Sequence, residues 1–233
     1  MVVKGNAGPD TLTDIGFATN GNLFGTSFTN FYSINQTTGA GTLISALGVG
    51  GGGMNALVGA PGGVLYAASN ANTSLFSITP SPFAASTFTG STGAASAGDL
   101  AFAGGFLYLS GVDAANGNDE LVRLTLSGTT ITNATVIGDF NQGATRFNGV
   151  FGLADDGTTM FAVNGTTIYS VNLTNAALTT VLDYSGHGLG TANGTAFVNE
   201  APSGVPEPGS LAILGTALAG LGFFCRRKPA PVA

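Results

Sequence analysis

Apolar residues in the first 200 positions occur in short groups, and within most groups they alternate with small or polar residues. A period of two is typical of β-strands, because successive side chains point to opposite faces of a sheet. Gly, Asn, Ser and Thr separate these groups every few positions, and they favour the tight turns that join strands. No helical period of useful length occurs before the C-terminal tail. The pattern therefore predicts an all-β body.

The order of the expected strands repeats four times along the chain. Each copy contains an apolar strand, a Gly turn, a Leu-Phe or Leu-Tyr type of strand, a further apolar strand and a Thr-rich strand. The second strands of the copies are 42, 42 and 53 residues apart, counted at Leu23, Leu65, Leu107 and Met160. The expected strands are 14–18, 21–25, 31–35 and 41–44; 56–58, 63–66, 75–78 and 86–88; 99–102, 105–108, 121–124 and 135–137; 150–153, 157–161, 168–171 and 179–182. Four short strands in roughly 40–45 residues is the period of a β-propeller blade.

The chain is expected to consist of a β-propeller-like repeat domain at 1–199, a linker at 200–204 and a C-terminal segment at 205–233. The repeats cover roughly 12–47, 54–90, 98–138 and 147–183, and a strand at 194–199 begins a fifth copy. This last strand is expected to close the ring. A larger ring of which these blades are the remainder, or an incompletely closed stack of sheets, are the alternatives.

Charge is scarce and unevenly distributed. Only 8% of the residues are charged, and eleven of the twelve acids but only three of the six bases precede residue 205. Phosphate binding requires clustered Lys and Arg, so the acidic body excludes nucleic-acid binding. Cys225 is the only cysteine, which excludes an intrachain disulfide and a Cys-based metal cage.

The tail has the pattern of a membrane-spanning segment. Residues 209–225 carry no charge, and Arg226, Arg227 and Lys228 follow directly. Seventeen residues form about 25 Å of helix, slightly short for a bilayer core of about 30 Å. The basic triplet predicts a cytoplasmic C-terminus by the positive-inside rule, with the body on the opposite side of the membrane. The alternative, a helix packed in a core, fits this flanking pattern less well.

Pro206, Glu207 and Pro208, followed by the apolar segment and the terminal basic cluster, resemble the PEP-CTERM sorting domain, also called the ice-binding protein C-terminal domain. The resemblance implies an exported protein of a Gram-negative bacterium that produces exopolysaccharide. It also implies an exosortase as partner, which recognises residues 206–208 as its substrate, and the lipid bilayer as partner of residues 209–225. Members of this family carry an N-terminal signal peptide, whereas residues 1–10 contain no apolar segment, so the natural start of the chain is expected to differ.

Residues that could carry catalysis are few. His187 is the only histidine and lies in a Gly-rich loop near Asp183, so a Ser-His-Asp triad could be built only there, and a solvated loop histidine is the simpler interpretation. Cys225 at the membrane boundary is interpreted as a bystander thiol, with lipidation as the alternative. No catalytic residue and no cofactor are expected.

Two acidic stretches, 113–120 and 155–157, contain the oxygen ligands that Ca²⁺ prefers. Neither has the spacing of an EF-hand loop, so exposed turns explain them and no metal ligand is expected. Five Asx residues lie near the starts of the first strands of the repeats: Asp14, Asn55, Asp99, Asn148 and Asn193. In a propeller this strand lines the central channel, so these side chains could converge at one mouth and hold a ligand. A preference of Asx residues for the turns that precede strands is the alternative.

The sequence thus predicts a non-enzymatic scaffold at the cell surface or in the extracellular matrix, sorted by an exosortase and associated with exopolysaccharide. An exported propeller enzyme, such as a metal-dependent hydrolase or lyase, and a carbohydrate-binding module are the alternatives.

Overall fold

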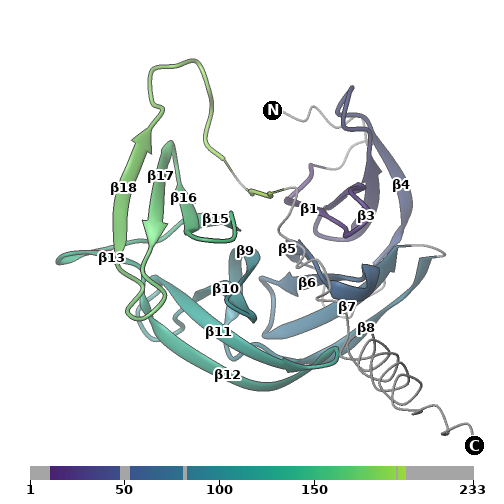
Figure 1. The fold of residues 1–233 in the computed structure, drawn as a ribbon, viewed down its shortest axis with the longest axis horizontal. Coiled ribbons are helices and arrows are strands. Elements are labelled where there is room, and N and C mark those ends of the chain that lie inside the picture. The colour runs from purple at the N-terminus through teal and green to yellow at the C-terminus, as the bar shows by residue number, and fades with distance from the viewer. Residues whose placement is uncertain (1–10, 48–52, 81–82, 193, 198–233) are drawn as a thin grey trace, which may run out of the picture. The chain divides into compact units, whose positions relative to one another are not determined.

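The computed structural model describes residues 11–47, 53–80, 83–192 and 194–197 of the 233-residue chain. All of them lie within one compact unit, Met1–Pro202. This body contains four antiparallel four-stranded sheets, each formed by consecutive strands and arranged around a common centre (Figure 1). The predicted all-β, propeller-like fold with four repeats of four strands is confirmed.

Each sheet is one blade, and its strands run outward from the centre in chain order. The first blade contains β1 (Asp14–Phe17), β2 (Leu23–Thr26), β3 (Asn30–Ile34) and β4 (Gly41–Ala46). The second contains β5 (Met54–Gly59), β6 (Leu65–Ser69), β7 (Ser74–Pro80) and β8 (Phe83–Ser91), with a short 3-10 turn, η1 (Pro61–Gly63), between β5 and β6. The third contains β9 (Ala95–Ala103), β10 (Phe106–Val112), β11 (Asp119–Ser127) and β12 (Thr130–Asp139). The fourth contains β15 (Val150–Asp155), β16 (Met160–Asn164), β17 (Thr167–Val171) and β18 (Leu178–Asp183), and a small hairpin of β13 (Asn141–Gln142) and β14 (Thr145–Arg146) precedes it.

Burial decreases from the centre of the body to its rim. Every residue of the inner strand β5 is buried, whereas most residues of the outer strands β4, β12 and β18 are exposed or half-buried. The Thr-rich composition of these outer strands fits this position, because a β-branched residue with a hydroxyl forms strands readily and tolerates water. The inner strands are mostly apolar, and their few polar side chains, such as Asp14 and Asp99, are buried.

Three apolar cores lie between successive blades. One packs Phe31 and Phe76 between the first two blades, a second packs Leu100 and Leu109 between the second and third, and a third packs Leu121 between the third and fourth. A single sheet exposes two faces, so each blade depends on its neighbours to bury them. Among the described residues no such core joins the fourth blade to the first.

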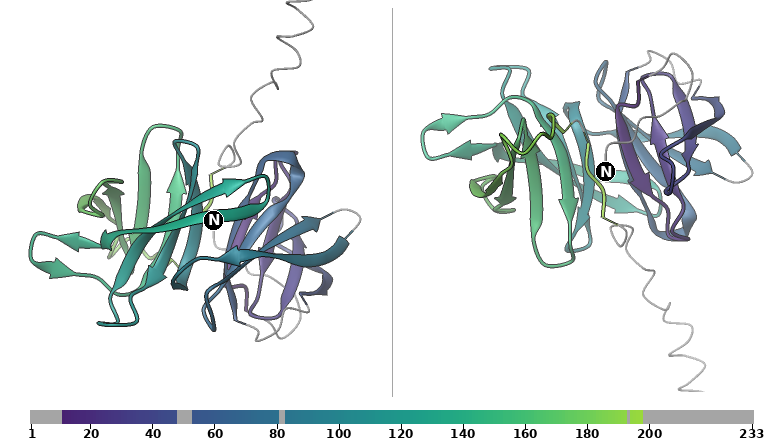
Figure 2. Two further views of the ribbon diagram at one scale, coloured as in Figure 1. Left: turned by 90° about the horizontal axis from the view of Figure 1, so that it is seen from below. Right: turned by 90° about the horizontal axis from the view of Figure 1, so that it is seen from above.

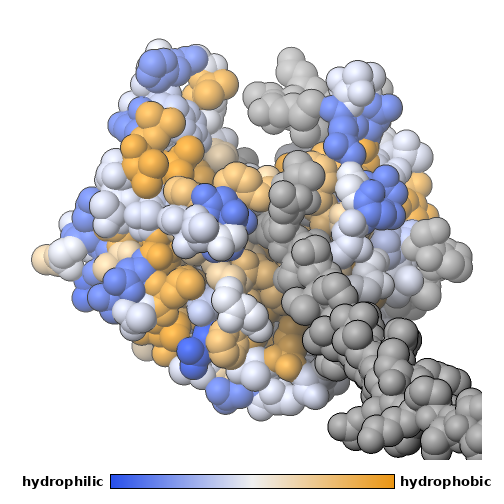
Figure 3. Space-filling model, viewed as in Figure 1, coloured by the Kyte–Doolittle hydropathy of each residue, from blue (hydrophilic) through white to orange (hydrophobic). Residues whose placement is uncertain are grey.

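The side between the fourth blade and the first is occupied by residues 194–197 instead. This segment runs lengthwise between the two blades, as the view from above in Figure 2 shows. The expected closing strand does not form at these residues, which have no strand pairing. In Figure 3 this side is a notch, with apolar side chains along the fourth blade beside it.

Glycines at two places allow a tight turn within the third blade and a close contact between the third and fourth blades. Gly104 and Gly105 have φ values of 55° and 84° and form the two-residue turn between β9 and β10, a turn that requires positive φ at both positions. Gly98 in β9 lies against the backbone of β15, and a Cβ placed there would be 2.6 Å from the Cα of Phe151. The inner strands of the third and fourth blades therefore approach each other only because residue 98 has no side chain.

Within these described ranges no helix is long and apolar enough to cross a membrane. The predicted linker at 200–204 and the predicted membrane span at 209–225 lie outside the described residues.

Candidate functional site

Two carboxyl groups meet at the centre of the body. Asp14 begins β1 and Asp99 is the fifth residue of β9, and their side chains lie close enough for each to change the pKa of the other. Asp14 is 3% exposed and Asp99 is fully buried. Two buried carboxyl groups this close to each other disfavour carrying a negative charge each, so the pair favours a state with one proton.

Each of these carboxylates also joins its own blade to the next one. Asp14 Oδ1 accepts a hydrogen bond from the Ile15 amide at 2.8 Å, and Oδ2 accepts one from the Leu57 amide of β5 at 2.6 Å. Asp99 Oδ1 accepts from the Leu100 amide, and Oδ2 accepts from the Leu153 amide of β15, both at 2.7 Å. The same arrangement therefore joins the first blade to the second and the third to the fourth.

The segment 194–197 lies on the carboxyl pair. The backbone N–H and the hydroxyl of Thr195 donate to Asp99 Oδ2 at 3.2 Å and 3.1 Å. Gly194 packs so closely on Asp14 that a Cβ at position 194 would overlap the carboxylate. The pair is thus covered on this side by the chain that leads to the C-terminal tail.

Burial changes the protonation of both groups. Desolvation raises the pKa of Asp99 to about 7, against the opposing effect of its hydrogen bonds from Asp14 and the backbone. Desolvation raises the pKa of Asp14 well above its usual range, and the charge of Asp99 and the hydrogen bond to it act in the same direction. The pair can therefore hold a proton near neutral pH, which is the property a general acid or base requires.

The structure brings together two of the five predicted channel residues. Asn55 is buried nearby but uses its Nδ2 to bind the Ser96 carbonyl at 3.2 Å. Asn148 is exposed, and only its backbone oxygen is used, by Asn164 Nδ2 at 2.7 Å. Asn193 lies outside the described residues. The predicted convergence of all five side chains at one mouth is not observed in the described part of the chain.

A pocket of about 370 Å³ opens where the inner strands begin, and we call it the mouth pocket. Its walls include hydroxyl, amide and aromatic side chains and no ionisable one: Thr11, Thr13, Asn55, Asn70, Phe28 and Phe151. Phe28 is 50% exposed and Phe151 is 40% exposed. Asn55 Oδ1 is buried without a hydrogen-bond partner, as is Ser96 Oγ behind it. A buried acceptor without a donor is costly, so it favours a ligand that supplies one.

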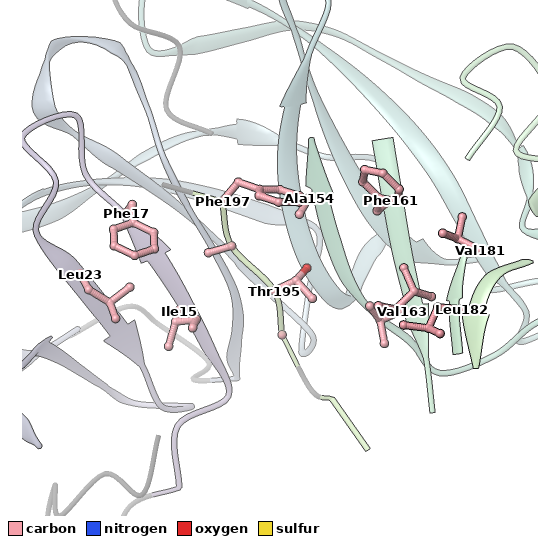
Figure 4. Close-up of a pocket in the computed structure, with 13 residues that line it drawn as sticks. Ile15, Phe17, Leu23, Ala154, Phe161, Val163, Val181, Leu182, Thr195 and Phe197 are labelled. Carbon is pink, nitrogen blue, oxygen red and sulfur yellow. The ribbon is translucent and has the colours of Figure 1, made fainter. Parts of the chain in front are cut away.

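A second, larger cavity of about 520 Å³ lies between the fourth blade and the first (Figure 4). Ile15, Phe17 and Leu23 line it from the first blade, and Phe161 and Val163 are among those that line it from the fourth. The segment 194–197 crosses this cavity, and the ring of Phe197 lies 6.1 Å from that of Phe161. The cavity is therefore an apolar space that the closing segment fills only in part.

The remaining candidates form no catalytic arrangement among the described residues. His187 is exposed, and its ring lies near the Asp183 carboxylate, whose pKa is lowered chiefly by the hydrogen bonds from Ser185. Asp155 and Asp156 accept hydrogen bonds from the backbone of the β15–β16 turn, so a role in stabilising this turn accounts for both residues. The sorting residues Pro206, Glu207 and Pro208, the basic residues Arg226, Arg227 and Lys228, and Cys225 all lie outside the described residues.

Residues 204–228 match the model of the PEP-CTERM protein-sorting motif. The chain carries a PEP-CTERM sorting signal. This signal belongs to exported proteins that are anchored at the membrane and processed by an exosortase. The match covers the proline pair, the apolar segment and the basic triplet, so the predicted resemblance is confirmed. None of the curated proteins is significantly similar to the chain in sequence.

Among solved structures, the body is similar to enzymes with the same type of fold. A gluconolactonase from Xanthomonas campestris has a TM-score of 0.55 and 14% identity, with 77% of this chain and 63% of that one covered. The glutaminyl cyclase of Myxococcus xanthus has a TM-score of 0.52 and 14% identity, with 95% and 77% covered. A PQQ-bound aldose sugar dehydrogenase from Streptomyces coelicolor has a TM-score of 0.51 and 17% identity, with 82% and 72% covered. The chain thus spans less than two thirds of the gluconolactonase.

The prediction that the chain is not an enzyme is contradicted by these similarities, because all three structures are enzymes. The prediction rested on the lack of a histidine or cysteine with partners nearby in the chain. Asp14 and Asp99, 85 residues apart, were predicted as possible ligand-holding channel residues, and a preference of Asx residues for turns was the alternative.

Asp119 was predicted only as part of the acidic stretch 113–120, and no role was predicted for Thr195 or for the two phenylalanines of the mouth pocket. Asp119 begins β11, and its Oδ2 accepts a hydrogen bond from the Val150 amide at 2.7 Å, so it too joins the third blade to the fourth. Burial raises its pKa to about 6. No local signal in the sequence distinguishes these residues from others of the same type in strands and loops.

Proposed function

We propose that the chain is a cell-surface or matrix protein of a Gram-negative bacterium, cut by an exosortase at Pro206, Glu207 and Pro208. Residues 209–225 span the membrane until processing, with Arg226 to Lys228 on the cytoplasmic side and the propeller body outside. The observation that carries this proposal is the match of residues 204–228 to the sorting motif. The acidic, charge-poor body fits an exported protein that contacts neutral polymers rather than nucleic acid.

The experiment compares processing in cells with and without the exosortase. The chain, preceded by a cleavable secretion signal, is expressed with Pro206, Glu207 and Pro208 intact or all replaced by Ala. Mass spectrometry of the released body is expected to show a new C-terminus near residue 206 only with the intact motif and the enzyme. Pro202→Ala serves as the matched control, because it removes a proline upstream of the motif. Equal processing of the triple variant would contradict the proposal.

We further propose that the mouth pocket binds a neutral sugar unit of the exopolysaccharide. Binding pockets combine apolar or aromatic walls with a few polar groups that fix orientation, and this pocket has Phe28 and Phe151 beside Asn55 and Asn70. The side-chain amides of Asn55 and Asn70 are the groups in these walls that can bind sugar hydroxyls. The lack of ionisable side chains in its walls favours a neutral ligand over a charged one.

Binding can be measured by calorimetry against purified exopolysaccharide and its oligosaccharides. We expect Phe28→Ala and Asn70→Ala to weaken binding at least about tenfold, since each removes a wall of the pocket or a hydrogen bond. Phe88→Ala is the matched control, because Phe88 is 59% exposed on β8 and does not line the pocket. Equal loss of binding with Phe88→Ala, or no binding by the wild type, would contradict this assignment.

A second candidate function is catalysis on the bound sugar. Thr13 and Gly98 line the mouth pocket, and they directly precede Asp14 and Asp99 in the chain. The carboxyl pair holds a proton near neutral pH, and two of the similar structures are, by name, enzymes that act on sugar derivatives. Chromatography of products after incubation with the polysaccharide tests this function. Turnover that survives in Asp99→Asn would exclude the pair as its acid or base.

A further inference from the structure

Three carboxylates lie together at the outer part of the third blade, and none of them lines the mouth pocket. Asp113 begins the loop between β10 and β11, Glu120 is the second residue of β11, and Asp139 ends β12 opposite Glu120. One ligand oxygen from each lies within 4.8 Å of the others. Acidic clusters of this kind are common on protein surfaces without a bound ion, so the proximity of the three carboxylates alone does not indicate a metal site.

Glu120 is the unusual member. As a residue it is only 7% exposed, and among the described residues no side chain or backbone N–H donates to its carboxylate and no base forms an ion pair with it. The other buried acids of the described chain, Asp14, Asp99 and Asp119, each accept backbone N–H groups. Burial raises the pKa of Glu120, and the charges of Asp113 and Asp139 raise it further. A carboxylate beside two like charges and without a protein donor is relieved either by a proton or by a bound cation.

The neighbouring groups compensate this charge only in part. Asn116 Nδ2 donates to Asp113 Oδ2 at 2.6 Å and to Asp139 Oδ2 at 3.2 Å, and Asn118 Nδ2 donates to Asp139 Oδ2 at 3.2 Å. The one base nearby, Arg146, has its Nε 3.7 Å from Asp139 Oδ2 and is half exposed. One arginine thus faces three carboxylates, and none of these donors reaches Glu120.

We propose that Asp113, Glu120 and Asp139 bind a calcium ion. All three ligands are oxygens, and neither histidine nor cysteine is present, which disfavours zinc. The amide oxygens and carbonyls of the 113–118 loop can complete the six to eight oxygens that Ca²⁺ takes, whereas Mg²⁺ demands a stricter octahedron. Extracellular calcium modules bind with a Kd of about 10⁻⁴–10⁻³ M, which suits an exported protein.

The position of the site gives the ion a structural role. Asp119, next to Glu120, receives the Val150 amide on its side chain, and its backbone N–H donates to the Phe147 carbonyl at 2.8 Å. An ion on Glu120 therefore holds the start of β11, which carries the contacts to the fourth blade. The proposal does not rest on sugar binding.

The test measures the melting temperature of the full-length chain in mild detergent, in EDTA and in CaCl₂. With a Kd of about 0.5 mM, about 10 mM CaCl₂ is expected to raise Tm by about 4–7 °C. Glu120→Gln is expected to raise Tm in EDTA, because it removes a repelled buried charge, and to abolish the calcium shift. Asp139→Asn provides the same calcium readout if Glu120→Gln does not fold. Asp156→Asn, which changes an exposed acid in the β15–β16 turn, is expected to keep the full shift.

Calorimetry with CaCl₂ alone supplies the second readout, with binding at least about tenfold weaker in Glu120→Gln. No shift in the wild type would overturn the proposal, and so would a shift that persists unchanged in Glu120→Gln and Asp139→Asn. An equal shift with MgCl₂ would overturn the assignment to calcium, because it would indicate general screening of the acidic surface.

Discussion

The Asp14–Asp99 pair makes the stability of the body depend on pH in an unusual direction. A buried carboxyl group with a raised pKa binds more protons in the folded state than in the unfolded state. For Asp99 the pKa in the folded state is about 7, against an ordinary value of 3.8, so its contribution to stability is fully present below the unfolded pKa. This stabilising contribution is lost as the pH rises from the unfolded pKa of 3.8 to the folded pKa of about 7. Most structural aspartates behave in the opposite way.

The size of the effect follows from this shift. Between roughly pH 5.5 and 8.5, a folded group of pKa about 7 releases its proton while the unfolded group is already ionised, which costs about 2 kcal/mol of unfolding free energy. For a body of this size that is about 4–8 °C in Tm. Asp99→Asn removes the titration of residue 99 and keeps an oxygen for the Leu153 amide, although its NH2 group can no longer accept the Leu100 amide.

The assay is urea denaturation of the wild type and Asp99→Asn at several pH values above the isoelectric pH of 4.3, where precipitation is avoided. We expect the wild type to lose stability with rising pH and Asp99→Asn to lose much less, so that the variant is the more stable protein near pH 8.5. Asp156→Asn is the control, because the pKa of this exposed acid is lowered and it titrates below the window. Parallel pH profiles for the wild type and Asp99→Asn would refute the reasoning.

Two further substitutions test how the blades pack. Gly98→Ala is expected to destabilise the body by about 1–3 kcal/mol in urea denaturation, because its Cβ would overlap the Phe151 backbone, whereas Gly190→Ala, with no atom within 4 Å, should be nearly neutral. Equal effects at the two positions would contradict the close approach of β9 and β15. Leu109→Ala, in the core between the second and third blades, should cost about 2–5 kcal/mol by the same assay. Leu189→Ala, at a side chain that is 56% exposed, should stay within about 0.5 kcal/mol, and a similar loss there would indicate a different core.

The repeat could be predicted because each strand shows a local alternation of apolar and polar residues. Leu23, Leu65 and Leu107 lie in the second strand of their blades, as the 42-residue spacing predicts. The longer interval of 53 residues before Met160 contains the extra hairpin of β13 and β14, for which the sequence offers no apolar signal. The expected closing strand at 194–199 lies only partly within the described residues, and its described part, 194–197, is held by the contacts of Thr195 with Asp99 rather than by strand pairing.

The candidate site was only partly predictable, because small offsets decide where a side chain points. Asp14 begins its strand, whereas Asp99 is the fifth residue of β9, so the two reach the same place from different strand positions. Asn148 precedes β15 by two residues and stays in solvent. The partners of the carboxylates are backbone amides 43 and 54 residues away, which any residue type could supply. No pattern of side chains along the chain encodes such contacts.

Although the chain has few charged residues, one buried acid, Asp99, has a central structural role. Asp99 receives both the Leu153 amide of the fourth blade and the amide and hydroxyl of Thr195, so one carboxylate fixes the last blade and the segment that follows it. Where the other three junctions have apolar cores, the junction between the fourth blade and the first has this anchor and the Phe197 ring. Thr195 and Phe197 both precede the sorting motif at residues 206–208. Cleavage there would therefore remove the tail and keep these contacts of Thr195 and Phe197 with the body.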